Sequence, residues 1–159
     1  MVKLKSPWSF WYHSSSNQDW SRDSYNYICK TDSAELFWGI YKSIKESHYN
    51  TGIFFIMKND VFPDWSSPEN KEGGFISIKI DISDLTPICK IWIEHMISEE
   101  IIDDISILPS VVNGLSVSPK NGHYILKLWC SQKTKSSKLK KNLPLISASK
   151  FTSFSYKKN

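Results

Sequence analysis

The order of the predicted elements indicates an α+β domain, in which an antiparallel β-sheet carries helices on one side. Strand and helix patterns follow one another as strands, helix, strands, helix and strands along the chain. The segment 75–82 alternates isoleucine with polar residues, which is typical of a half-buried antiparallel strand. The pair Asn121-Gly122 between two apolar segments is a strong signal for a two-residue hairpin turn.

The strands are expected where aromatic, β-branched or alternating residues gather. They cover residues 8–13, 25–30, 52–57, 75–82, 111–117, 124–129 and 151–156. A polar loop is expected after the first strand, and a longer loop with two prolines and a Gly-Gly pair covers residues 62–74.

Two helices interrupt the strands. The first is predicted to begin at Asp32, with Glu35 three residues on as a variant of the capping box. Its expected apolar stripe consists of Phe37, Ile40, Tyr41 and Ile44. The second is predicted to begin at Thr86, with Pro87 in its first turn. Its expected apolar stripe consists of Ile88, Ile91, Trp92 and His95.

The length of 159 residues suits one domain over 1–159, and a hydrophobic content of 40% is sufficient for a core. Residues 1–6 are expected to form a short arm, and residues 131–159 a shortened, Lys/Ser-rich C-terminal part. The chain has no apolar run as long as a membrane span and no apolar signal region at its start, so a cytoplasmic location is expected. Three widely spaced cysteines show no metal-ligand pattern and are expected to be reduced thiols: Cys29, Cys89 and Cys130.

Charge is divided unevenly along the chain. All 16 acidic residues lie within residues 1–104, whereas residues 105–159 contain 10 lysines and no acid. Such a basic segment favours a polyanionic partner. The stretch 132–142 equally fits a solubilising, partly disordered tail.

Seven tryptophans are spread along the chain rather than gathered in one segment. The segments around them are 7–12, Asp19-Trp20, 35–41, 54–58 with 62–65, 70–74, 91–94 and 126–129. In this order they resemble the eukaryotic translation initiation factor four E family, whose members bind the 5′ cap of messenger RNA. The resemblance covers residues 7–130 and implies a curved sheet with the helices on its convex face and the cap pocket on its concave side.

The resemblance assigns roles to three tryptophans. Trp20 and Trp65 correspond to the two indoles that sandwich the 7-methylguanine base, and both lie in polar, loop-like sequence. Trp129 corresponds to the residue that lines the pocket at the N7-methyl group. A methylated guanine is a cation, so indole faces attract it in addition to stacking on it.

The guanine edge is where this chain departs from the family. In the family, a glutamate follows the second stacking tryptophan and accepts two hydrogen bonds from the guanine edge. Here that position is Ser66, whose hydroxyl cannot make the same bidentate, charge-assisted pair. Glu69 or Asp64 is a possible substitute, and both also fit solvated loop acids.

Lysines are expected to contact the cap phosphates. Lys120 falls on one of the family's basic positions near the hairpin turn. Lys127 lies two residues before Trp129 on the same strand and therefore on the same face. His123 is a weaker third candidate, and solvated hairpin lysines are the alternative interpretation.

A second surface is implied on the helices. There the family receives a Tyr/Leu-containing helix of the initiation scaffold subunit or of a repressor. The residues expected to form this patch are Ala34, Trp38, Ile93, Glu94 and, at its margin, Ile97. The alternative for Trp38 is that it packs only against its own neighbours.

Catalysis is not expected, because the four histidines are scattered and no nucleophile–base order or Gly-rich phosphate loop is present. Neither a cofactor nor a metal is expected. The sequence therefore predicts a protein that binds the 7-methylguanosine cap and recruits messenger RNA to the initiation machinery. The alternative is a protein of the same fold with weak or lost cap binding, acting as a scaffold-binding decoy or regulator.

Overall fold

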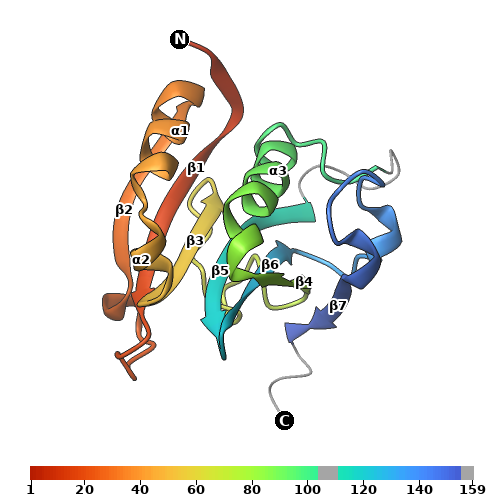
Figure 1. Ribbon diagram of the computed structural model, residues 1–159. Helices are drawn as coiled ribbons and strands as arrows, with labels where there is room; N and C mark the ends of the chain where they lie inside the picture. The colour runs from red at the N-terminus through yellow and green to blue at the C-terminus, as the bar shows by residue number, and fades with distance from the viewer. Residues whose placement is uncertain (104–110, 155–159) are drawn as a thin grey trace.

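The computed structural model describes residues 1–103 and 111–154, which contain a seven-stranded antiparallel sheet with helices on one face (Figure 1). The strands are β1 (Lys3–Ser14), β2 (Asn26–Ser33), β3 (Gly52–Lys58), β4 (Gly74–Asp81), β5 (Val112–Lys120), β6 (His123–Cys130) and β7 (Lys150–Ser153). Their order in the sheet is β2-β1-β3-β5-β6-β4-β7. The helices are α1 (Ala34–Ser43), α2 (Glu46–Tyr49) and α3 (Leu85–Ile97). The predicted α+β architecture is confirmed.

Alternation along the strands divides the apolar side chains between the two faces of the sheet. On the helix side, strand residues such as Phe10, Ile78 and Leu128 pack in one cluster with Phe37 and Trp92 of the helices. On the other side lies a smaller, largely aromatic cluster: Tyr25, Phe55, Met57, Val61, Phe75, Trp129 and Phe154. The sheet therefore separates the main core, which contains residues of α1 and α3, from an aromatic face on its other side.

The first strand is longer than predicted, because residues 3–6 belong to β1 and not to a free arm. The backbone N–H of Val2 donates to the Glu35 carboxylate at 2.9 Å. The Ser6 hydroxyl donates to Glu99 Oε1 at 2.6 Å. These contacts hold the beginning of the chain against α1 and the end of α3.

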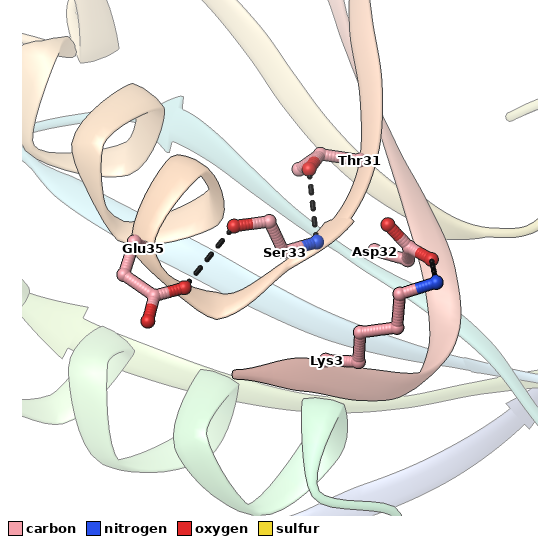
Figure 2. Close-up of polar contacts among 5 residues, drawn as sticks. All are labelled: Lys3, Thr31, Asp32, Ser33 and Glu35. Atoms are coloured by element: carbon pink, nitrogen blue, oxygen red, sulfur yellow. Dashed lines mark hydrogen bonds and ion pairs between the residues drawn. The ribbon is translucent and has the colours of Figure 1, made fainter. Parts of the chain in front are cut away.

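The first helix is capped by Ser33 and not, as predicted, by Asp32. Ser33 Oγ accepts a hydrogen bond from the backbone N–H of Leu36 at 3.3 Å, and it donates to Glu35 at 3.2 Å. Asp32 instead forms an ion pair with Lys3 at 3.6 Å (Figure 2). Because β2 continues through Ser33, residue 32 is still in extended backbone and lies too early to cap the helix.

The helix α3, which corresponds to the second predicted helix, buries a different stripe from the predicted one. Its buried residues are Leu85, Ile88, Cys89, Trp92, Ile93, Met96 and Ile97, which recur at helical spacing. Ile91 is 36% exposed and His95 is half-buried, so the predicted stripe was centred one residue too early. The exposure expected for Ile93 and Ile97 is consequently wrong, since they are 1% and 4% exposed.

The predicted hairpin is confirmed. Lys120 pairs with His123, and the two residues between them have left-handed backbone, with φ of 48° at Asn121 and 82° at Gly122. Such angles are the requirement of the tight turn that Asn-Gly favours.

The segment after β6 packs against the helix-side cluster. Leu139 and Leu143 are buried there, and the indole N–H of Trp92 donates to the carbonyl of Pro144 at 3.1 Å. Residues 132–142 are thus part of the folded domain and not the disordered tail that their composition also allowed. The predicted last strand appears as β7, and its expected end at residues 155–156 lies outside the described residues.

The three cysteines are free thiols, as expected. Cys89 and Cys130 are buried, and burial raises the pKa of each thiol to about 12. Among the described residues, no helix has the length and apolar character that crossing a membrane requires.

Candidate functional site

A pocket of about 370 Å³ lies against the aromatic face of the sheet. Two loops supply Trp20 and Trp65 to its lining, and β6 supplies Lys127 and Trp129. The structure therefore brings together four of the residues that sequence analysis proposed for cap binding. Asp64 also lines this pocket.

Trp20 is held in an ordered loop between β1 and β2. Its indole stacks on the imidazole of His13 with ring centroids 3.7 Å apart and an interplanar angle of 5°. The loop backbone is fastened by Asp19, whose carboxylate accepts from the N–H of Ser21 at 2.8 Å and from its hydroxyl at 3.0 Å. These hydrogen bonds lower the pKa of Asp19. Trp20 is 49% exposed, so much of its indole surface is open at the pocket.

Trp65 lies on the loop between β3 and β4 and is 42% exposed. Asn70, with no exposed surface, ties this loop together by donating to the carbonyls of Phe62 at 3.1 Å and Asp64 at 2.8 Å. Asn113 of β5 donates to the Asn70 side-chain oxygen at 2.9 Å. The loop that presents Trp65 is therefore anchored to the sheet through two buried amides.

Trp129 forms the inner wall of the pocket. It is only 6% exposed, and its indole N–H donates to the Ser116 hydroxyl at 3.0 Å. Phe154 packs against it with ring centroids 4.9 Å apart. The ammonium of Lys127 lies 4.4 Å from the centre of the Phe75 ring, on the same face of β6 as Trp129.

Asp64 is the carboxylate of the pocket lining. The backbone N–H of Ser66 donates to Asp64 Oδ1 at 2.7 Å, and the Ser66 hydroxyl donates to the same oxygen. Burial, and then the negative charge of Asp64, raise the pKa of Tyr25, which lines the pocket as well. Glu69 is exposed and is absent from the pocket lining.

Lys120 lies apart from this pocket. Together with His123 it lines a separate hollow of about 280 Å³ around the Asn121-Gly122 turn. The structure therefore places Lys127 beside the three tryptophans and does not bring Lys120 or His123 to them.

The patch expected on the helices is reduced by the orientation of α3. Trp38 is half-buried and lies edge-on to Phe37 and Tyr41, with ring centroids 5.3 and 5.5 Å apart. Ala34 is half-buried and Glu94 is exposed. Ile93 points into the core and contributes no surface. Two apolar residues that sequence analysis did not assign to this patch are exposed on the same helices: Leu36 on α1 and Ile91 on α3.

Sequence analysis also missed three side chains that hold the pocket together: His13, Asn70 and Asn113. Asn70 had a signal, because an amide inside a long loop with two prolines can donate to loop carbonyls that neither helix nor sheet pairs. His13 had a weaker signal, since its strand position puts it on the face of Trp11, opposite Phe10.

The family is established by comparison of the whole chain. The family model described as "Eukaryotic initiation factor 4E" matches residues 3–159. The chain belongs to the eukaryotic initiation factor 4E family. It is similar to the eukaryotic translation initiation factor 4E of Saccharomyces cerevisiae, with 27% identity over 145 residues. The match covers 83% of this chain and 63% of the yeast protein, so the chain spans less than two thirds of that relative's length.

Solved structures show the same fold at low sequence identity. Ascaris suum eIF4E-3 in complex with m7G cap matches with a TM-score of 0.69 and 20% identity, covering 85% of this chain and 76% of that one. Caenorhabditis elegans eIF4E-3 in complex with the 4E-binding protein Mextli and cap analog matches with a TM-score of 0.72 and 19% identity. That match covers 82% of this chain and 74% of the nematode chain.

Proposed function

We propose that this protein binds the 7-methylguanosine cap of messenger RNA in the pocket on the aromatic face of the sheet. The observation that carries the proposal is the pair Trp20 and Trp65, which two separate loops bring to one pocket with large parts of both indoles exposed. Large aromatic side chains are ordinarily buried, so two half-exposed indoles beside one cavity favour a flat, stacking ligand.

The same pair of indoles favours a positively charged ring. Methylation at N7 gives guanine a delocalised positive charge, and the indole faces are negative. Each indole contributes about 0.5–2 kcal/mol of cation–π attraction, and stacking of the base contributes about 1–3 kcal/mol. An unmethylated base retains the stacking and loses the charge-dependent part, so the pocket selects the methylated form.

Asp64 is proposed to read the guanine edge in place of the missing glutamate. The edge of guanine presents N–H donors, and a carboxylate in the pocket is the group that accepts them with charge assistance. Ser66 donates to one oxygen of Asp64 and thereby orients the carboxylate, whereas Glu69 lies outside the lining. Asp64→Asn should therefore weaken binding more than Glu69→Gln, which equilibrium titration with 7-methyl-GTP would measure.

Lys127 is proposed to contact the cap phosphates, because it is the lysine of the pocket lining. Lys120, at the hairpin turn, is proposed as a more distant contact for cap phosphates that extend toward that turn. A point charge such as lysine attracts a triphosphate without requiring a fixed fork geometry. Membership of the family and the helix-side location of Trp38 support recruitment of a scaffold or repressor helix as the second part of the function.

A cap-affinity resin tests the proposal. We expect retention on immobilised 7-methyl-GTP, elution by free 7-methyl-GTP, and weaker elution by unmethylated GTP. Trp20→Ala and Trp65→Ala should each lose about 1–3 kcal/mol of affinity with the fold intact. Absence of retention for the folded wild-type protein would refute cap binding and favour the decoy alternative, in which only the helix-side patch functions.

A further inference from the structure

His13 is a buried polar side chain directly beneath a residue of the proposed cap site. It lies on β1, has no exposed surface, and stacks on one face of the Trp20 indole at 3.7 Å and 5°. Tyr25 packs edge-on against both the His13 and the Trp20 rings. One indole face is thus covered by the protein itself, and a ligand can stack only on the other.

The hydrogen bonds of His13 reach the loop on both sides of Trp20. Its Nε2 lies 2.7 Å from the carbonyl oxygen of Asp19 and 3.2 Å from the hydroxyl of Ser24. A carbonyl only accepts, so Nε2 carries the hydrogen and donates it. The Ser24 hydroxyl donates to the Ser21 carbonyl at 2.6 Å and is therefore an acceptor toward His13.

We propose that His13 is a positioning residue for Trp20. Its ring supports one indole face, and its Nε2 binds the backbone carbonyl of Asp19 before the tryptophan and the side-chain hydroxyl of Ser24 after it. An indole that is already in place when the ligand arrives spares the ordering cost of binding, which is the physical origin of the gain in affinity. The inference rests on the proposed function, since it deepens the role of Trp20 in that site.

Two substitutions separate the stack from the hydrogen bonds. His13→Phe retains an aromatic ring of similar size and loses only the Nε2 contacts, since Nδ1 has no hydrogen-bond partner among the described residues. His13→Ala loses both. We expect His13→Ala to weaken 7-methyl-GTP binding about tenfold, and His13→Phe to weaken it about threefold or less. In a Trp20→Ala background, His13→Ala should cause no further loss.

A second measurement needs no ligand. With fluorotryptophan incorporated, the Trp20 fluorine resonance is identified by its loss in Trp20→Phe, and His13→Ala should shift or broaden it. Phe10→Leu, a core change on the same strand, should lower stability and leave that resonance in place.

The two measurements give distinct outcomes. An unchanged Trp20 resonance in folded His13→Ala overturns the proposal, and so do affinity losses that add fully to those of Trp20→Ala. If wild-type protein fails to bind 7-methyl-GTP, cap binding is refuted, and the resonance still decides whether His13 positions Trp20.

Discussion

Asn70, one of the two buried amides that anchor the loop presenting Trp65, offers a sharp test of the site. Asn70→Ala deletes the donor to the carbonyls of Phe62 and Asp64 and the acceptor used by Asn113. These three hydrogen bonds have lengths of 2.8–3.1 Å and involve a side chain with no exposed surface. The substitution therefore acts on loop geometry without changing any residue of the pocket lining.

The expected magnitude follows from the number of contacts. A net contribution of about 0.5–1.5 kcal/mol for each of the three hydrogen bonds gives a loss of about 1.5–4.5 kcal/mol in the free energy of unfolding. The Asn113 amide keeps its bond to the Glu69 carbonyl at 2.7 Å, so that donor is not left wholly unsatisfied. Because the Asn113 donor keeps one partner, we expect the loss in the free energy of unfolding to lie near the middle of this range.

Urea unfolding and 7-methyl-GTP titration measure the two consequences. We expect a lower unfolding midpoint and, in the folded protein, a cap affinity reduced by about tenfold, because Trp65 is no longer held in place. Lys71→Ala, an exposed neighbour on the same loop, is the matched control and should change neither quantity. If Asn70→Ala keeps full cap affinity while losing stability, the loop is ordered by other contacts and our account of Trp65 is refuted.

Three further predictions address other parts of the molecule. Lys127→Ala should weaken binding of 7-methyl-GTP much more than that of 7-methylguanosine, and more than Lys120→Ala does; equal losses for nucleotide and nucleoside would assign Lys127 to folding. Trp38→Ala should abolish pull-down of a Tyr/Leu-containing partner helix and leave cap-resin retention intact, with circular dichroism as the check on folding. The free energy of unfolding should fall as pH rises from about 9 toward 12, because burial raises the pKa of the Cys89 thiol from 9.0 to about 12. In that window the Cys89 thiol ionises in the unfolded chain and stays protonated in the folded one. Cys89→Ala should show a shallower fall, and an identical pH profile would contradict this reasoning.

The sheet was predictable because its signals are local. Alternating residues in β4 and the Asn-Gly turn between β5 and β6 each indicate strand structure without reference to the rest of the chain. The same alternation placed Lys127 and Trp129 on one face, and the structure confirms that they line one pocket. Trp20 and Trp65, which we propose to stack on the base, were selected through resemblance together with their polar, loop-like surroundings, and they line the same pocket.

The errors concern positions that tertiary packing decides. In α3 the sequence is apolar at so many positions that several stripes are possible, and contact with the sheet selects the one containing Ile93. The start of α1 depends on how far β2 extends, which pairing with β1 determines. His13 was missed because its strand position indicates only which face it occupies, and not that residue 20 folds back over residue 13 to stack on it.

The alternation of β6 constrains how this chain can change during evolution. Leu126 and Leu128 belong to the core beneath the helices, while Lys127 and Trp129, which alternate with them, line the pocket. Inserting or deleting a single residue within the strand would exchange the two sets, placing a lysine in the core and leucines in the pocket. Substitution can therefore alter the pocket lining while leaving the core unchanged, whereas a change in the length of this strand would disturb both faces at once.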